Sequence, residues 1–363
     1  MKILFIAPYP KGRAPSQRFR FEQYFRYLAL DHIDCELAPF WSEKGWNILY
    51  SKGNYLRKFT QLILGFLRRI FLMFRIRQYD RILIHREATP IGPPMFEMII
   101  VRWFNKKFYF DFDDAVWMDN TSKENELVAR LKYHNKVPAI CRWADKVSCG
   151  NQWLAEYASQ FNRRVVVLPT TIDIDHHKPL MHAGASGKVT IGWTGTHSTG
   201  RYLTMLKKVL RGLHERFSID FLVISNHPPD SPDNFWRYEP WDKEKEIRQL
   251  QDMDIGIMPL EDTDWEKGKC GFKALQYMAV GIPAVVSPVG VNIEIIEHGV
   301  SGYLCETDNE WSQAVTELIT DADKRKEVGR SGRKRVEQLY SSKVNKEIFY
   351  QILDLDDNNK NKS

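Results

Sequence analysis

Short apolar runs alternate with helical segments along this chain, and the alternation starts twice. The first round opens with the apolar run Lys2–Ala7, which a basic loop and a helix expected over Gln17–Leu30 follow. The second round opens with Val189–Trp193, followed by the loop GTHSTG and a helix expected over Tyr202–Phe217. Continuous apolar runs of this kind are typical of strands buried on both faces of a parallel sheet. The pattern therefore predicts an α/β chain with two doubly wound, Rossmann-like domains.

The length of the chain also favours two domains. It has 363 residues, whereas a single hydrophobic core stops growing at about 250–300 residues. Residues 179–187 are small, polar and glycine-containing, which suits a linker. We therefore expect an N-terminal domain over residues 1–178, a C-terminal domain over residues 188–340, and a helix and tail over 341–363 that can pack back on the N-terminal domain. Two such domains present their strand ends to each other across a cleft, which suits an enzyme with one ligand per domain.

The composition indicates the cellular setting, and the absence of several motifs argues against secreted, membrane-spanning, dinucleotide-binding and P-loop proteins. The net charge is a mild +6, and the five cysteines form no C-x-x-C pair, which favours a reducing cytosol. The apolar start ends at Ala7, before Pro8, and is too short for a signal peptide. No apolar run reaches the about 18 residues of a transmembrane helix. Neither a dinucleotide-binding G-x-G-x-x-G nor a P-loop motif is present. We expect a cytoplasmic protein without a nucleic-acid partner.

The stretch Lys267–Pro283, KGKCGFKALQYMAVGIP, combines a glycine-containing loop with the start of an amphipathic helix. If the helix begins near Gly271, Lys273 and Gln276 share one face, and Lys269 lies in the loop ahead of it. Free main-chain N–H groups and nearby cations at a helix start form a site for an anion, most often a phosphate. The alternative is an ordinary surface helix with solvated lysines. Phe272 is expected on the face that packs against a sheet.

In the first domain, candidate residues follow the expected strand ends. The loop after Lys2–Ala7 carries Gly12 and Arg18, and it is either a wall of a ligand cleft or a solvated basic loop. His85 ends the apolar run RILIH, and Asp113 follows the run KFYFDF. Asp113 can orient an acceptor hydroxyl, act as a base or cap the next helix. The neighbouring acidic residues lack a second ligand cluster, so we expect no metal site.

The segment Tyr55–Tyr79, YLRKFTQLILGFLRRIFLMFRIRQY, has an unusual combination of properties. Apolar residues recur in it at spacings of three and four, and six Arg and Lys residues occur with no acidic residue between them. This composition is typical of a helix that lies on an anionic membrane surface. The alternative is a core helix whose arginines face solvent. We expect contact with a membrane surface.

Several motifs together resemble the glycosyltransferases of the GT-B fold, in particular family four. They are GKCGFKALQYMAVGIPAVVSPVG, IGWTGTHST, DIGIMPL, HGVSGYL and the strand end DFDDAVW. The resemblance implies transfer of a sugar from a nucleotide diphosphate sugar, with retention of the anomeric configuration and without a metal or other cofactor. It implies that His85 and Asp113 lie in the catalytic region. It also implies a set of donor-binding residues: Gly12, Arg18, Gly195, Thr196, Lys269, Gly271, Phe272, Lys273 and Gln276.

The sequence departs from the family at two positions. Family members carry a Glu, seven residues and a second Glu in this helix region; here Gly268 and Gln276 occupy those positions. Gln276 can still exchange hydrogen bonds with a ribose, but Gly268 cannot replace a carboxylate. We expect a glycosyltransferase at the inner face of the membrane, acting on a lipid-linked or cell-envelope acceptor. The alternatives are a non-catalytic nucleotide-sugar-binding or scaffold protein and, less favoured, a phosphorylase-like enzyme.

Overall fold

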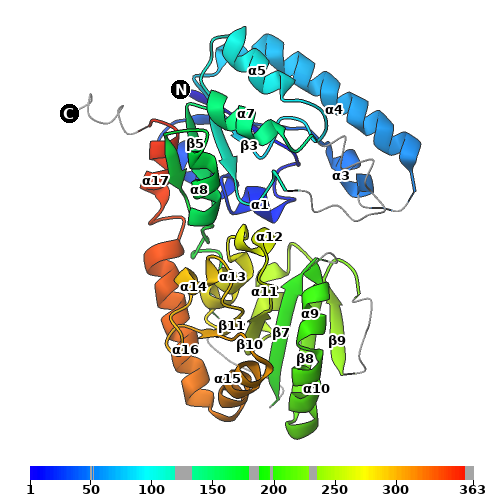
Figure 1. Cartoon of the computed structure of the whole chain (residues 1–363), viewed down its shortest axis with the longest axis vertical. Helices are drawn as coiled ribbons and strands as arrows, with labels where there is room; N and C mark the ends of the chain where they lie inside the picture. The colour runs from blue at the N-terminus through cyan, green and yellow to red at the C-terminus, as the bar shows by residue number, and fades with distance from the viewer. Residues whose placement is uncertain are drawn as a thin grey trace, which may run out of the picture. The chain divides into compact units, whose positions relative to one another are not determined.

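The computed structural model describes residues 1–49, 51, 53–118, 133–179, 188–196, 199–228 and 235–355. The chain forms two compact units, Met1–Thr170 joined by the chain from Asn345 onward, and Thr171–Val344 (Figure 1). These boundaries differ from the expected 178 and 340, because the main chain of Ile172 pairs with that of Tyr340 and Ser342 inside the second unit. Most of the expected linker lies outside the described residues.

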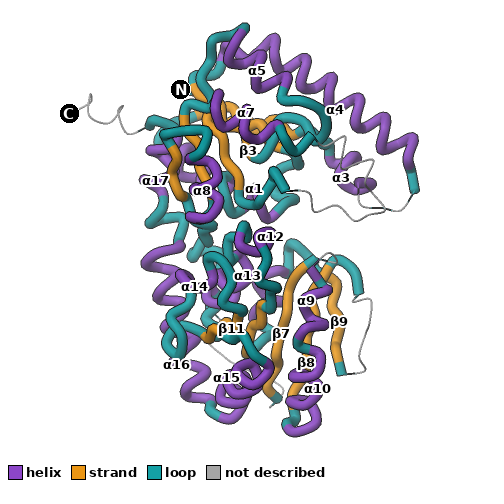
Figure 2. The backbone as a smooth tube through the Cα atoms, in the orientation of Figure 1, coloured by secondary structure: helices purple, strands orange, loops and turns teal. Residues whose placement is uncertain are grey.

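The first unit contains a parallel sheet of six strands in the order β2-β1-β3-β4-β5-β6. Figure 2 shows its strands in orange between helices. The strands are β1 Lys2–Ala7, β2 Asp34–Pro39, β3 Arg81–His85, β4 Tyr109–Phe112, β5 Lys146–Cys149 and β6 Val165–Val167. Strands β1, β3 and β4 coincide with or overlap the apolar runs Lys2–Ala7, RILIH and KFYFDF, because apolar residues fill both faces of a parallel sheet.

The C-terminal helix α17, Lys346–Ile352, completes the core of the first unit. Its Phe349 stacks on Tyr24 with ring centroids 4.3 Å apart, and both rings belong to one cluster with Ile3 and Phe5 of β1. In Figure 1 the red α17 lies beside β5. The end of the chain is therefore part of the first core, although some 180 residues of the second unit separate it from β6 in sequence.

The helix expected over Gln17–Leu30 is broken into three short pieces, α1 Pro15–Arg18, the 3-10 turn η1 Glu22–Tyr24 and α2 Phe25–Leu30. The break has a physical cause, since Arg20 turns into the interior, where it is 1% exposed. The remaining helices of this unit are α3 Glu43–Leu49, α4 Tyr55–Arg75 continued by η2 Ile76–Gln78, α5 Met95–Arg102, α7 Lys136–Trp143 and α8 Gln152–Ser159.

Helix α4 buries a face that includes Gly65, Arg69, Leu72 and Met73, and it exposes most of its large apolar side chains. Arg69 is buried and donates to the main-chain oxygens of Ala7, Ala38 and Ala88, so it fastens α4 to the strand ends of the sheet. The exposed large apolar side chains of this helix are Tyr55, Leu56, Phe59, Ile63, Leu64, Leu67, Ile70, Phe71 and Phe74. The alternative of a core helix is therefore wrong in that this apolar face is not buried, although Arg57 and Arg75 do face solvent as it expected. Among the described residues, no helix has both the length and the apolar character needed to cross a bilayer.

The second unit contains another parallel six-stranded sheet, in the order β12-β11-β10-β7-β8-β9. Its strands are β7 Val189–Gly195, β8 Ile219–Ser225, β9 Trp236–Pro240, β10 Ile255–Met258, β11 Ala284–Val286 and β12 Tyr303–Leu304. Its helices are α9 Arg201–Met205, α10 Lys207–Arg216, α11 Glu246–Gln251, α12 Asp264–Lys267, α13 Phe272–Ala279, α14 Asn292–Ile295, α15 Asp308–Thr320 and α16 Ala322–Arg335 with the π-helical turn η5 Val336–Tyr340. The single helix expected over 202–217 is thus divided between α9 and α10.

Candidate functional site

Each sheet has one point at which the order of its strands reverses. In the first sheet β1 and β3 are neighbours although β2 separates them in sequence, and in the second sheet β7 and β10 are neighbours. Ligands of doubly wound sheets bind at such a switch point, outside the carboxyl ends of the strands. The first switch point carries the segment after β1 and His85, the last residue of β3. The second carries Gly195, the last residue of β7, and the chain that leads from β10 to α13.

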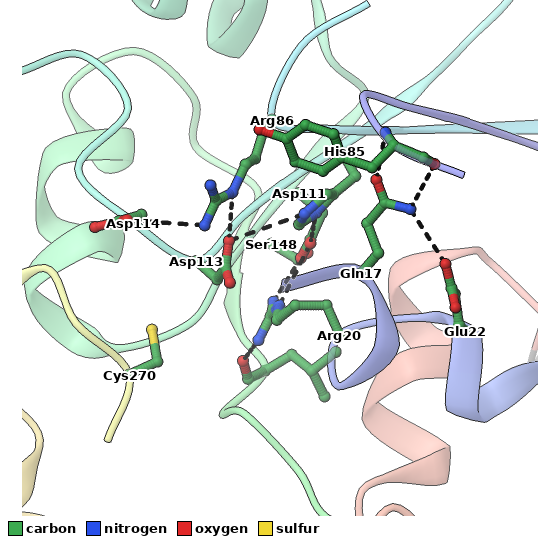
Figure 3. Close-up of polar contacts among 12 residues, drawn as sticks. Gln17, Arg20, Glu22, His85, Arg86, Asp111, Asp113, Asp114, Ser148 and Cys270 are labelled. Atoms are coloured by element: carbon green, nitrogen blue, oxygen red, sulfur yellow. Dashed lines mark hydrogen bonds and ion pairs between the residues drawn. The ribbon is translucent and has the colours of Figure 1, made fainter. Parts of the chain in front are cut away.

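His85 lies in a buried polar network at the first switch point. Its side chain is fully buried, and its Nδ1 atom is 2.8 Å from Oδ2 of Asp111, the neighbouring residue on β4. The Arg20 guanidinium lies 2.5 Å from Oδ1 of Asp111, and the Ser148 hydroxyl of β5 donates to the same oxygen. Figure 3 shows the three side chains converging on the Asp111 carboxylate. Burial alone would raise the pKa of Asp111, but the Arg20 charge and the His85 hydrogen bond outweigh it and hold this pKa well below its usual range.

The other ring nitrogen of His85 faces Asp113. Nε2 lies 3.9 Å from Oδ1 of Asp113 and makes no hydrogen bond with any residue that the structure describes. Asp113 in turn accepts a hydrogen bond from Arg86 Nε at 2.8 Å, and Asp114 lies 3.8 Å from the same guanidinium. Burial would lower the pKa of Arg86, but the two carboxylates raise it above its ordinary value. This pairing suits Asp113 for orienting a hydroxyl better than for removing a proton.

The backbone of Arg86 has an uncommon conformation, with φ of +60°. Residues other than glycine rarely adopt the left-handed region, and such strain concentrates at functional sites. The Arg86 N–H donates to the Asp111 main-chain oxygen at 2.7 Å, which holds this turn against the end of β4. The strain therefore lies directly after His85, at the edge of the sheet where ligands bind.

The loop after β1 has internal hydrogen bonds that fix its shape. The amide of Gln17 exchanges two hydrogen bonds with the main chain of Tyr9, and it also donates to Glu22 at 3.1 Å. Gly12 donates its main-chain N–H to Glu22 at 2.7 Å. Arg18 is half-buried, with its guanidinium 5.0 Å from the Phe19 ring centroid. This is a shaped loop at the switch point, so the alternative of a fully solvated basic loop does not describe it.

In the second unit, α13 begins as the spacing of the stretch Lys267–Pro283 predicts. Gly271 is its N-cap with φ of +64°, and a Cβ there would lie 2.1 Å from Cδ1 of Ile295, so only glycine fits. Phe272 is the first residue of the helix and is half-buried, and Lys269 lies in the loop ahead, with Nζ 5.6 Å from the Trp265 ring centroid. The helix start thus combines main-chain N–H groups with a nearby cation, as an anion site requires.

Lys273 and Gln276 lie on the same face of α13, but their surroundings differ. Lys273 is half-buried over the ring of Trp193 from β7, with Nζ 5.6 Å from the ring centroid. Burial, with a smaller effect of Lys269, lowers the pKa of Lys273 to about 7. Gln276 is 2% exposed, and its Nε2 has no hydrogen-bond partner among the described residues. A buried donor without a partner is costly, so this face of α13 is suited to a polar, anionic ligand.

The loop after β7 lies beside these side chains. A Cβ on Gly195 would lie 2.3 Å from the Trp193 ring, the same ring that contacts Lys273. Thr196 donates its N–H to the hydroxyl of Thr199 at 3.1 Å. The structure thus brings the predicted Gly195 and Lys273 to one place within the second unit, through the Trp193 indole.

Sequence reasoning missed several residues of these sites. Arg20, Asp111 and Ser148 around His85 come from segments far apart in sequence, and only Asp111 gave a signal, as an acid at a strand end. Glu266 was also missed. It lies two residues before Gly268, is 1% exposed and accepts hydrogen bonds from the hydroxyls of Tyr202 and Thr263. Glu266 is thus a buried carboxylate near the family's first Glu position, but its oxygens already accept hydrogen bonds within the protein.

Comparison with known proteins finds a family resemblance in the second unit. Residues 188–321, which contain α13, match the family described as Glycosyl transferases group 1. A stretch of 102 residues is 36% identical to N-acetyl-alpha-D-glucosaminyl L-malate synthase of Bacillus anthracis. The matched stretch covers 26% of this chain and 26% of that enzyme, so the chain spans about a quarter of the length of this relative.

Solved structures resemble the chain over nearly its whole length. Sucrose-phosphate synthase of Thermosynechococcus elongatus superposes with a TM-score of 0.70 at 13% identity, over 97% of this chain and 98% of that one. Anabaena HepE in complex with UDP-glucose gives a TM-score of 0.66 at 15% identity, over 97% and 99%. A glycosyltransferase of Rickettsia africae gives 0.66 at 15% identity, over 97% and 98%. The chain therefore has the GT-B fold of two Rossmann-like units, and its second unit resembles the group 1 glycosyltransferases.

Proposed function

We propose that this protein transfers a sugar from a nucleotide diphosphate sugar to an acceptor, and that the start of α13 binds the donor. One observation carries the proposal. Lys273 and Gln276 share one face of α13, where burial lowers the pKa of the lysine and the amide nitrogen has no partner among the described residues. A nucleotide diphosphate would offset both unfavourable features, because its anionic oxygens stabilise the buried lysine charge and its hydroxyl groups accept the amide hydrogen bond.

In this proposal the donor's diphosphate lies at the N-terminus of α13. Lys273, Lys269 and the main-chain N–H groups after Gly271 supply the positive charge that stabilises the leaving diphosphate. The reaction therefore draws on the chain's own cations and needs no metal. Gln276 stands where the family has a carboxylate, and it donates its Nε2 hydrogen to a ribose hydroxyl. Gly195 and Thr196, beside Trp193, approach the diphosphate from the loop after β7.

In the first unit, His85 and Asp113 are the proposed catalytic side chains. Nε2 of His85 has no hydrogen-bond partner among the described residues, and Asp113 is held by Arg86 in an orientation that suits a hydroxyl partner. Gly12 and Arg18 belong to the shaped loop beside them. Retention of the anomeric configuration is proposed from the resemblance to family four. NMR of the anomeric proton of the product tests it.

The acceptor is proposed to be lipid-linked or part of the cell envelope, reached from the cytoplasmic face of a membrane. The observation behind this is α4, whose apolar face is exposed from Tyr55 to Phe74. Such a face, together with the exposed cations Arg57 and Arg77, fits an anionic lipid surface, into which an amphipathic helix inserts its apolar side. The protein then lies peripherally on the membrane through residues 55–79.

A thermal-shift screen of UDP, GDP, ADP and CMP sugars tests the donor part of this proposal. Because HepE was solved with UDP-glucose, UDP-glucose is the first probe. A ligand at 100 times its dissociation constant stabilises a protein by about 2.7 kcal/mol, which raises the melting temperature by several degrees. No shift with any sugar nucleotide at millimolar concentration would contradict the proposal.

A second candidate function is non-catalytic binding of a nucleotide sugar. Gly268 favours it, because the family's first carboxylate is absent and the nearby Glu266 already accepts hydrogen bonds from Tyr202 and Thr263. The two candidates differ in turnover. A protein that is stabilised by a sugar nucleotide, yet releases no nucleoside diphosphate from it with any acceptor or with water, is a binding protein.

A further inference from the structure

We infer that Arg20 and Asp111 are positioning residues, which hold the His85 imidazole so that Nε2 is the hydrogen-bond acceptor offered to a ligand at the first switch point. This inference rests on the proposed function, because it assigns the orientation of a side chain in the same site. It concerns the residues behind His85, which do not themselves touch the ligand.

The geometry around Asp111 decides where the imidazole proton lies. The Asp111 carboxylate receives the Arg20 guanidinium and the Ser148 hydroxyl on Oδ1 and faces His85 Nδ1 through Oδ2. A carboxylate that is paired with a buried arginine stays ionised and can only accept hydrogen bonds. The hydrogen between Nδ1 and Oδ2 must therefore belong to the imidazole, so that in the neutral tautomer it is Nε2 that carries the lone pair.

Arg20 is the residue that makes this arrangement stable. Its guanidinium also donates to the main-chain oxygen of Leu168, just after the edge strand β6. Arg20 therefore links Asp111 to that edge of the sheet. Without this charge, burial would raise the pKa of Asp111 and favour its protonated form. A protonated Asp111 would donate to Nδ1, and Nε2 would then carry the hydrogen.

The surroundings of the His85 ring hold it in the orientation in which Nδ1 faces Asp111. His85 is fully buried, and its ring meets the edge of Phe21 with centroids 5.4 Å apart. On the Nε2 side the nearest carboxylate, Asp113, is bound to Arg86 instead.

Nitrogen-15 NMR of the full chain, labelled at its histidines, tests the inference. The signal of His85 is assigned by its loss in His85→Gln. We expect the wild-type ring to carry its hydrogen on Nδ1, Arg20→Lys to keep this state, and Arg20→Met to move the hydrogen toward Nε2. A wild-type ring with its hydrogen on Nε2, or an unchanged His85 signal in Arg20→Met, would overturn the inference.

Turnover of UDP-glucose, measured as release of UDP, provides a second readout. We expect Arg20→Met to lower kcat at least about tenfold with KM changed less than about twofold, and Arg20→Lys to recover most of the loss, since one lost charge-assisted hydrogen bond corresponds to about tenfold. Arg26→Met, which removes a nearby arginine of α2 outside this network, is the matched control. Equal kcat for Arg20→Met and wild type would overturn the inference.

The two readouts separate this inference from the proposed function. If the wild-type protein turns over no sugar nucleotide, the proposed function fails, while the NMR signal of His85 still reports whether Arg20 sets its tautomer. If Arg20→Met does not fold, Arg20→Gln takes its place, because it removes the charge while keeping a side chain that can donate to Asp111. The same outcomes then apply to Arg20→Gln.

Discussion

The ammonium group of Lys273 on α13 lies over the indole ring of Trp193 on β7, 5.6 Å from the ring centroid. A cation on an aromatic face is stabilised, but burial still lowers the pKa of Lys273 to about 7. The lysine is thus poised to regain its full charge when an anion arrives.

Donor affinity is therefore expected to depend on pH. A bound diphosphate favours the charged lysine, so binding takes up a proton, and affinity falls as the pH rises above about 7. We expect affinity for UDP-glucose to fall about tenfold between pH 6 and pH 8, for a free pKa of about 7 and a much higher bound value. A sugar nucleotide is the right probe, because its diphosphate has no ionisation in this range.

Isothermal titration calorimetry at several pH values checks this expectation. Lys273→Met should bind more weakly and lose the pH dependence, whereas Lys208→Met, an exposed lysine of α10, should behave like the wild type. Equal wild-type affinities at pH 6 and pH 8 would mean that Lys273 does not meet the diphosphate.

Gln276 is expected to contribute to ribose binding alone. Its buried Nε2 gains a partner when the nucleoside binds, and a hydrogen bond of this kind contributes about 0.5–1.5 kcal/mol, or about three- to tenfold in affinity. Gln276→Leu should therefore bind UDP more weakly by this factor but bind pyrophosphate unchanged. A parallel loss for both ligands would place Gln276 at the phosphates or in a purely structural role.

The exposed face of α4 is expected to bind anionic vesicles. Each large apolar side chain transferred from water contributes about 1.5–3 kcal/mol, so Phe71→Ser combined with Phe74→Ser should weaken partitioning by at least about a hundredfold. Leu30→Ser, which removes an exposed apolar residue at the end of α2, is the control.

Vesicle sedimentation with and without anionic lipid measures this partitioning. Raising the salt concentration should weaken the binding, because the attraction of Arg57 and Arg77 to the lipid surface is screened. The membrane assignment would have to be given up if the double variant and the wild type sedimented equally.

Gly271 is expected to be required for stability of the second unit. Its φ of +64° disfavours any side chain, and a Cβ would lie 2.1 Å from Ile295. Gly271→Ala should therefore cost more than the about 1 kcal/mol that strain at a positive φ costs by itself. Gly299→Ala has a similar φ of +75° but open space around the position, and it isolates the strain. Urea unfolding of both variants compares the two; equal losses would show that the Ile295 contact is relieved.

The strands and the α/β class could be predicted from the sequence, because a strand buried on both faces leaves a continuous apolar run such as Lys2–Ala7. The start of α13 could be predicted too, since Gly271 and the lysines around it are local signals. The partners of His85 could not. Arg20 and Asp111 meet across 91 residues, and no periodicity reveals which of several arginines in one loop turns inward.

The orientation of α4 shows a second limit of the sequence. Its period reveals an apolar face but cannot say whether that face meets the core or the solvent. Arg69 decides the matter, because three main-chain oxygens at the ends of β1 and β2 and after β3 bind its guanidinium and turn the opposite face outward. Such main-chain acceptors exist only once the sheet has formed.

Release of nucleoside diphosphate from sugar nucleotides tests the central claim most directly. The protein is incubated with UDP, GDP and ADP sugars, in the presence and absence of lipid extracts as acceptors, and the released nucleotide is quantified. We predict that the wild type releases nucleoside diphosphate from one of these donors and that Lys273→Met loses most of this activity while Lys208→Met retains it. A folded wild-type protein that binds a sugar nucleotide and never releases the diphosphate would contradict the assignment as a transferase.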